Sequence, residues 1–339
     1  MRAIIQKLKN KKNLTEKESE KMIRAMIGGE MSPNQMVSVL ISLAKKGETA
    51  PEILGAIRAM RSVMKTLDIG NQAIDTCGTG GDGKGTFNIS TTVAFVVVGA
   101  GGKVAKHGNR KASSLCGSAD VLEELGVNIM LSPENAKKVF ENVGLVFLFA
   151  QIYHPAMKNV GPVRKKLGIR TIFNYLGPFC NPASTSRQVV GVASHDVRGL
   201  LERVACKLNY DHLALVSSDE GMDEVSIISK TSISRIQRKN IKNMIIDPKK
   251  YGFGSINDKV LKGGNAKQNA KIIKDILKGK KSANRNVVIL NSAVTLYVSG
   301  IAPNIESGIK LATDSIDSGR ANRTLDALIN FSNKYELDI

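Results

Sequence analysis

The sequence contains no tryptophan and is poor in aromatic residues, which make up 4% of its 339 positions. Apolar residues nevertheless account for 42% of the chain. The core must therefore be built from aliphatic side chains, a composition typical of helices packed on parallel strands. Composition thus favours an α/β fold, and the length is sufficient for more than one lobe.

Cysteine is also scarce, and the four residues present, Cys77, Cys116, Cys180 and Cys206, lie far apart without a CxxC pair. This spacing argues against a disulfide framework or a zinc site. Long apolar runs are missing near the N-terminus, where only Ala3 to Ile5 is apolar, too little for a signal-peptide core or a membrane span. We expect a cytoplasmic protein with no membrane partner.

Acidic residues are few relative to basic ones: 30 Asp and Glu against 49 Lys and Arg give a formal net charge of +19. Such a surplus attracts polyanions. Basic stretches such as Lys7 to Lys12 and Arg235 to Lys250 are more typical of a solvated surface. A nucleic-acid-binding protein stays an alternative, which salt-dependent retention on DNA or RNA would identify.

The first 65 residues carry repeated helix-start signals. Thr15, Ser32 and Thr49 are each followed three residues later by Glu or Gln, the pattern of a capping box. Apolar residues between these signals recur at helical spacing. The sequence predicts a small helical domain over residues 1–69, joined by helices from 155–180 and providing a dimerisation surface.

After about residue 70 short apolar runs, glycine turns and helical segments alternate, as in βα units. The predicted strands are Ala73 to Cys77, Lys103 to Lys106, Leu145 to Phe149, Val189 to Val192 and Leu213 to Val216. The expected architecture is an α/β domain over residues 70–339, with a mostly parallel central sheet and flanking helices.

A glycine-rich segment from Gly78 to Gly85 follows the first predicted strand and precedes Asn88 to Thr91, which opens an apolar helix. Glycines allow backbone amides to approach a ligand, and amides at a helix N-terminus attract anions. The P-loop pattern is absent, and the GxGxxG over residues 78–83 lacks an acidic residue at the end of the next strand. The segment therefore predicts a phosphate site that does not serve ATP or NAD.

Two further segments strengthen the phosphate hypothesis. Lys106 to Lys111, followed by Ser113, Ser114 and Ser118, places cations and hydroxyls at the carboxyl end of a strand, where open α/β sheets bind ligands. The adjacent carboxylates of Asp223 and Glu224 follow the fifth predicted strand. Such a pair can share Mg²⁺ with substrate phosphates.

Taken together, these motifs resemble those of the anthranilate phosphoribosyltransferases, and the resemblance covers nearly the whole chain. The matching pieces are GTGGDG at 78–83, NIST at 88–91, KHGNR at 106–110, GSADVLEELG at 117–126, FLFAQIYHPAMK at 147–158, GIRTIFNYLGP at 168–178 and DEVS at 223–226. The resemblance implies transfer of a phosphoribosyl group from phosphoribosyl pyrophosphate (PRPP) to the amine of anthranilate, in tryptophan biosynthesis. It also implies two Mg²⁺ ions per subunit, a homodimer formed through the N-terminal helices, and no nucleic-acid partner.

The resemblance also implies which residues form the site. Those expected to bind PRPP are Gly78, Thr79, Gly81, Asp82, Thr86, Asn88, Ile89, Ser90, Thr91, Lys106, His107, Gly108, Asn109, Arg110, Lys111, Ala112, Ser113, Ser114 and Ser118. Those expected at anthranilate are Gly78, His107, Asn109, Tyr153, His154 and Arg164, and the metal ligands are Ser90, Asp223 and Glu224. Lys106 and Arg164 act electrostatically, and no acid–base residue is implied.

The sequence departs from the family pattern at two places. Cys116 stands where the family usually has Ser, and Phe179 and Cys180 replace the usual Leu and Thr or Leu. The first departure bears on the motion of the loop from Lys106 to Ser118. A pyrimidine nucleoside phosphorylase of the same fold is an alternative, against which the intact GTGGDG, KHGNR and DEVS set argues. Phosphorolysis of thymidine or uridine would identify it.

Overall fold

The computed structural model describes residues 1–111, 115–254 and 258–335. The chain forms two compact units. Residues 1–66 and 151–182 form the first, here called the helical unit, and residues 67–150 and 183–339 form the second, the α/β unit. A segment from the middle of the chain thus packs with the N-terminal helices.

The helical unit contains no strand among its described residues. Its α-helices are α1 (Arg2–Lys9), α2 (Glu16–Ile27), α3 (Pro33–Lys46), α4 (Ala50–Arg61), α8 (Ala150–Tyr153), α9 (Gly161–Leu167) and α10 (Phe173–Leu176), with 3₁₀ turns η1 (Pro155–Asn159) and η2 (Gly177–Cys180). Thr15 and Ser32 close the predicted capping boxes. At Thr49 the Glu52 carboxylate accepts hydrogen bonds from the backbone N–H at 2.8 Å and the hydroxyl at 2.9 Å.

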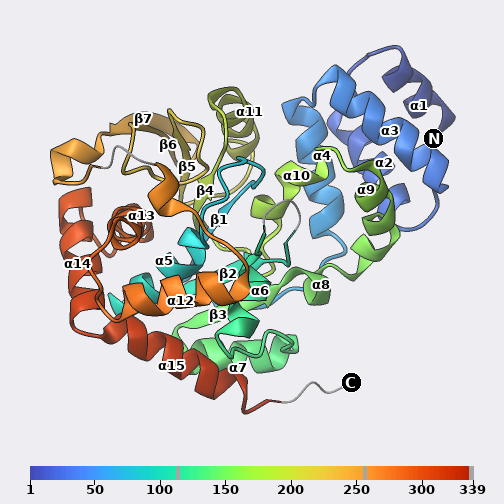
Figure 1. Ribbon diagram of the computed structural model, residues 1–339. Coiled ribbons are helices and arrows are strands. Elements are labelled where there is room, and N and C mark those ends of the chain that lie inside the picture. The colour runs from blue at the N-terminus through green and yellow to red at the C-terminus, as the bar shows by residue number, and fades with distance from the viewer. Residues whose placement is uncertain (112–114, 255–257, 336–339) are drawn as a thin grey trace. The chain divides into compact units, whose positions relative to one another are not determined.

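The α/β unit is built on a seven-stranded sheet with the order β3-β2-β1-β4-β5-β6-β7 (Figure 1). The strands are β1 (Ile74–Gly78), β2 (Val104–Gly108), β3 (Leu145–Phe149), β4 (Arg187–Gly191), β5 (His212–Ser218), β6 (Thr231–Gln237) and β7 (Asn240–Ile246). The pairings among β1 to β5 are parallel, whereas β6 and β7 pair antiparallel. The predicted fold class, a helical domain plus an α/β domain with a mostly parallel sheet, is confirmed.

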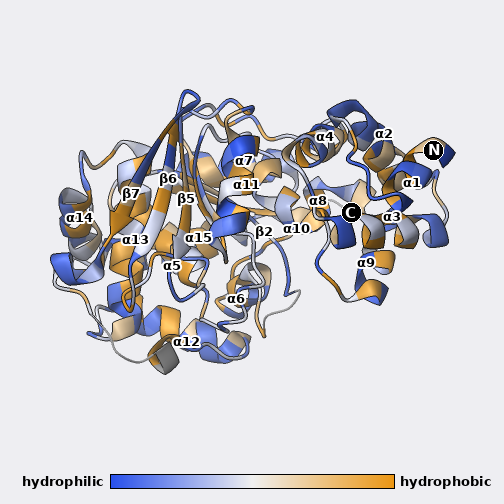
Figure 2. Cartoon of the chain, turned by 90° about the horizontal axis from the view of Figure 1, so that it is seen from above, coloured by the Kyte–Doolittle hydropathy of each residue, from blue (hydrophilic) through white to orange (hydrophobic). Residues whose placement is uncertain are grey.

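The β6–β7 hairpin was not predicted from the sequence, whereas the interpretation of Arg235 to Lys250 as a solvated stretch agrees with the exposure of most of β7. This stretch contains the end of β6 and all of β7, the edge strand. Most of β7 is exposed, and its apolar residues, Ile241, Met244, Ile245 and Ile246, do not alternate regularly with its polar ones, so its pattern does not mark a half-buried strand. In Figure 2 hydrophilic residues gather at the outer end of this hairpin.

Helices cover the sheet and position its strand ends. They are α5 (Ile89–Gly99), α6 (Ser118–Glu124), α7 (Pro133–Val143), α11 (His195–Ala205), α12 (Ala266–Leu277), α13 (Ala283–Ser299), α14 (Ile305–Asp317) and α15 (Arg320–Ser332), with η3 (Pro248–Tyr251) and η4 (Asp258–Leu261). Helices α5 and α13 are buried nearly all round, since they lie between the sheet and the outer helices α14 and α15 (Figure 1).

Among the described residues, no helix is both long and apolar enough to cross a membrane.

Candidate functional site

The site begins with two glycines that end neighbouring strands. Gly78 at the end of β1 pairs in register with Gly191 at the end of β4. A Cβ on Gly78 would lie 2.4 Å from Oδ2 of Asp223, and one on Gly191 would lie 1.6 Å from the Asp223 carbonyl oxygen. Neither distance is sterically possible, so the missing side chains are what allow the loop carrying Asp223 to cross the strand ends.

The glycine-rich segment then forms an exposed turn beside this carboxylate. Gly80, Gly81, Gly83 and Gly85 all have positive φ, a backbone conformation that other residues rarely adopt. The Gly80 N–H donates to Oδ2 of Asp223 at 2.9 Å. The turn, whose backbone conformation favours glycine, is therefore hydrogen-bonded directly to Asp223, the first of the two adjacent acids.

Lys106 lies beneath the start of α5. Its ammonium donates to the Thr76 carbonyl at 2.6 Å and to the Ser90 hydroxyl at 3.1 Å. The side chain is 3% exposed, and this burial lowers the pKa of Lys106. The backbone of Ser90, at the N-terminus of α5, favours the ionised form of the Glu224 carboxylate and opposes the rise of its pKa. The helix start thus holds a cation on one side and an acid on the other.

Three carboxylates crowd this position. Burial, followed by the nearby Asp82, raises the pKa of Asp223 to about 7. Burial and the neighbouring Asp223 raise the pKa of Glu224 well above its usual range, although Lys106 opposes the shift. Crowded like charges disfavour ionisation, and a divalent cation would relieve the repulsion. The donor set is all oxygen, which suits Mg²⁺. The described residues include no group of three or more His, Cys, Asp or Glu side chains arranged as metal ligands.

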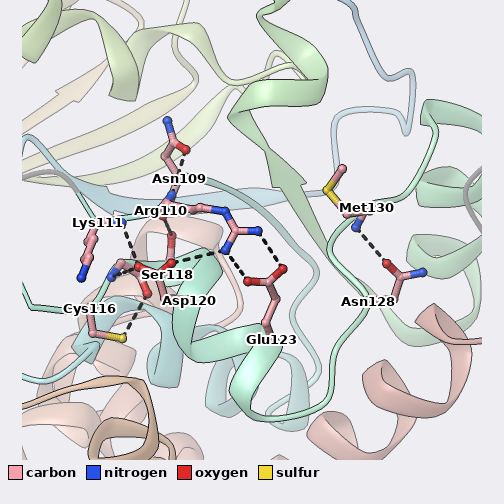
Figure 3. Close-up of polar contacts among 10 residues, drawn as sticks. Asn109, Arg110, Lys111, Cys116, Ser118, Asp120, Glu123, Asn128 and Met130 are labelled. Carbon is pink, nitrogen blue, oxygen red and sulfur yellow. Dashed lines mark hydrogen bonds and ion pairs between the residues drawn. The ribbon is translucent and has the colours of Figure 1, made fainter. Parts of the chain in front are cut away.

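The loop after β2 is closed at its base by Asp120 of α6 (Figure 3). One oxygen, Oδ2, accepts from the backbone N–H of Lys111 and of Gly117, each at 2.8 Å. The Arg110 guanidinium pairs with Glu123, at 2.8 Å through Nη2, and lies over a phenyl ring of β3. The contact of Arg110 with PRPP stays a prediction. Its ion pair with Glu123 attaches the loop to α6.

Three residues predicted on this loop, Ala112, Ser113 and Ser114, lie outside the described residues. The departure from the family pattern at Cys116 is accommodated by burial, which raises the pKa of its thiol to about 11. The Cys116 carbonyl accepts from Nδ2 of Asn88 at 3.3 Å. The loop is therefore linked to the N-cap of α5.

Other residues predicted to contact a second substrate belong to the helical unit. Arg164 on α9 lies over Phe173 at 5.3 Å and forms no ion pair with any described residue. Burial lowers its pKa. Tyr153 and His154 are buried, which raises the pKa of Tyr153 and lowers that of His154 to about 4. Asn109 lies in the α/β unit, and a single pocket shared with these residues stays a prediction.

Among the buried residues that support the site, Asp75 and Asn269 were not identified from the sequence. Asp75, fully buried in β1, accepts from the His107 N–H at 3.3 Å and from Gln188 at 3.1 Å. The sequence did indicate Asp75, because an acidic residue within a central strand is rare unless it has hydrogen-bond partners. Asn269 of α12 donates to Oδ1 of Asn88 at 2.9 Å. No pattern in the sequence around Asn269 predicts this contact, because Asn88 lies 181 residues away in the chain.

Comparison with known proteins gives consistent matches. The glycosyl transferase family matches through its α/β domain over residues 70–322 and its helical bundle domain over residues 2–64. An anthranilate phosphoribosyltransferase from Bacillus cereus is 43% identical over 98% of both chains. The crystal structure of one from Thermus thermophilus has a TM-score of 0.91 at 35% identity, over 97% of this chain and 99% of that one.

The enzyme of that name from Saccharomyces cerevisiae has been solved with PRPP and Mg, and it is similar at 28% identity and a TM-score of 0.89 over 98% of both chains. Its structure with 4-fluoroanthranilate gives 26% identity and a TM-score of 0.88, again over 98% of both chains.

The pKa of Asp223 predicts a dependence of stability on pH. It is raised from 3.8 to about 7, so folding favours the protonated carboxyl. This stabilising contribution is complete below the unfolded-state pKa and is lost as pH rises through the folded-state value. We expect the metal-free protein to lose stability from about pH 4 to about pH 8, and Asp223→Asn to lose less. Urea unfolding of both proteins across this range checks it; parallel curves would contradict the shift.

Proposed function

The chain belongs to the anthranilate phosphoribosyltransferase family, and we propose that the glycine turn, Lys106 and the Asp223–Glu224 pair are its site for PRPP and Mg²⁺. The protein is a glycosyltransferase that transfers the phosphoribosyl group of PRPP to the amine of anthranilate. The products are N-(5-phosphoribosyl)anthranilate and pyrophosphate, in tryptophan biosynthesis. The observation that carries the site assignment is the crowding of carboxylates against a glycine-rich turn.

In this proposal the α/β unit holds the donor substrate. The backbone amides of residues 78–85, the N-terminus of α5 and Lys106 surround a position suited to a pyrophosphate. As the bond to pyrophosphate breaks, negative charge accumulates on the leaving group, and prepositioned amides and cations stabilise that charge. Ser118 and Asn109 lie on the adjoining loop, whose base Asp120 closes.

Asp223, Glu224 and Ser90 would hold Mg²⁺, and we propose two ions per subunit. When bound, the ions neutralise charge on the pyrophosphate. Support comes from the repulsion among the carboxylates and from the yeast relative solved with PRPP and Mg. The protein's own contribution is to keep the Asp223 and Glu224 side chains near the carboxyl ends of the parallel strands.

The helical unit would bind anthranilate through Arg164. Its guanidinium has no acidic partner among the described residues and is partly desolvated, which suits a carboxylate ligand. The yeast relative solved with 4-fluoroanthranilate binds an analogue of this kind. The arylamine is already unprotonated at neutral pH, so a strong base is not needed. Burial keeps the pKa of His154 near 4, and its neutral ring would line the pocket.

We further propose a cytoplasmic homodimer formed through the N-terminal helices. The two alternatives raised by the sequence, a nucleoside phosphorylase and a nucleic-acid-binding protein, are less favoured. A nucleic-acid-binding protein has no need for the carboxylates, whose burial and mutual repulsion cost stability without a cation.

The role of Arg164 predicts a selective kinetic defect. Arg164→Ala should raise KM for anthranilate by about tenfold or more, because a charge-assisted bond contributes on the order of 1.5–3 kcal/mol. KM for PRPP should change little. Lys165→Ala, which alters the next, exposed position of α9, serves as the control in steady-state assays. An unchanged KM for anthranilate would remove the assignment.

The carboxylate pair predicts a defect in metal use. The double variant Asp223→Asn with Glu224→Gln should need at least about tenfold more Mg²⁺ for half-maximal activity, because two negatively charged ligands are lost. Asp219→Asn changes a nearby exposed acid and should respond to Mg²⁺ as the wild type does. A double variant with an ordinary Mg²⁺ dependence would refute the metal role.

A further inference from the structure

Asn291, in the middle of α13, is a buried amide within an otherwise largely apolar helix. It is 4% exposed. Its Oδ1 accepts from the Val225 N–H at 2.8 Å, and its Nδ2 donates to the Val225 carbonyl at 2.7 Å and to the Val287 carbonyl at 2.8 Å. The side chain therefore binds both backbone polar groups of one residue and uses both of its own donor hydrogens.

Val225 directly follows Glu224, and the residue before Asp223 is held in a similar way. The Ser218 hydroxyl at the end of β5 accepts from the Met222 N–H at 2.8 Å and donates to the Met222 carbonyl at 3.0 Å. Asp223 and Glu224 therefore lie between Met222 and Val225. The backbone of each of these flanking residues is hydrogen-bonded to one buried side chain, that of Ser218 or Asn291.

These contacts oppose a specific force. The carboxylates of Asp82, Asp223 and Glu224 repel one another when ionised, and this repulsion adds to burial, the larger cause, in raising the pKa values of Asp223 and Glu224. Without side-chain hydrogen bonds to its backbone, the loop could change conformation so that the acidic side chains move apart, which would relieve the repulsion. Because the backbones of Met222 and Val225 are both held by hydrogen bonds, the backbone of Asp223 and Glu224 between them is restrained at both ends.

We propose that Asn291 is a positioning residue that keeps Asp223 and Glu224 in the geometry required for Mg²⁺, with Ser218 acting from the other side. The inference rests on the proposed metal role of the two acids. Asn291 touches neither substrate nor metal and acts only through the backbone of Val225. Residues that orient metal ligands typically change metal affinity by about 10–100-fold when they are replaced.

The test compares Asn291→Leu, which keeps the approximate shape but removes the amide, with Ser218→Ala as a second, independent variant. Thr295→Val is the matched control: the Thr295 hydroxyl donates to the Asn291 carbonyl at 2.9 Å, so its loss removes a buried bond from the same helix without touching Val225. Two readouts are taken for each protein. One is amide hydrogen exchange of residues 219–226 without metal, and the other is the Mg²⁺ dependence of PRPP binding by calorimetry.

Asn291→Leu and Ser218→Ala should exchange faster in this segment and need about tenfold more Mg²⁺ to bind PRPP, whereas Thr295→Val should only melt earlier. If folded Asn291→Leu and Ser218→Ala match Thr295→Val in both readouts, the positioning role is wrong. If the wild type binds PRPP with no dependence on Mg²⁺, the proposed metal role fails first, and the inference falls with it. The two failures are therefore distinguishable.

Discussion

The repulsion among three acidic side chains, Asp82, Asp223 and Glu224, is the constraint around which the site is organised. Burial and proximity raise the pKa values of Asp223 and Glu224, so the metal-free fold holds these groups at an electrostatic cost. Lys106, also buried, offsets part of the cost at Glu224. A cation added to this cluster would relieve a repulsion that is already present, which supports the proposed metal role of these acids.

The fold maintains this arrangement by geometry. Two glycines in register at the ends of β1 and β4 leave space for the loop carrying Asp223, and the turn beyond β1 returns a backbone amide to that carboxylate. Buried side chains then fix the backbone on both sides of the acidic dipeptide, through Ser218 and Asn291. Because each restraint comes from a different element, the site depends on β1, β4, β5 and α13 together.

Sequence patterns predicted those parts of the molecule whose signals are local. Apolar runs and glycine turns marked the five parallel strands, whereas Gly78 to Gly85 was weak evidence for an anion site until it was combined with the other motifs. The edge hairpin was missed, because β7 is mostly exposed and its apolar residues do not alternate regularly with polar ones. Asn291 was missed for another reason: its role arises from a contact that only folding creates, since Asn291 and Val225 lie 66 residues apart in the sequence.

We propose that these residues form a Mg²⁺-dependent site that transfers a phosphoribosyl group to anthranilate. The most direct measurement follows the intrinsic fluorescence of anthranilate after PRPP is added to the purified protein, with Mg²⁺ or with a chelator. We expect a steady loss of fluorescence with Mg²⁺ and none with the chelator. Unchanged fluorescence in the presence of Mg²⁺, from protein shown to be folded, would contradict it.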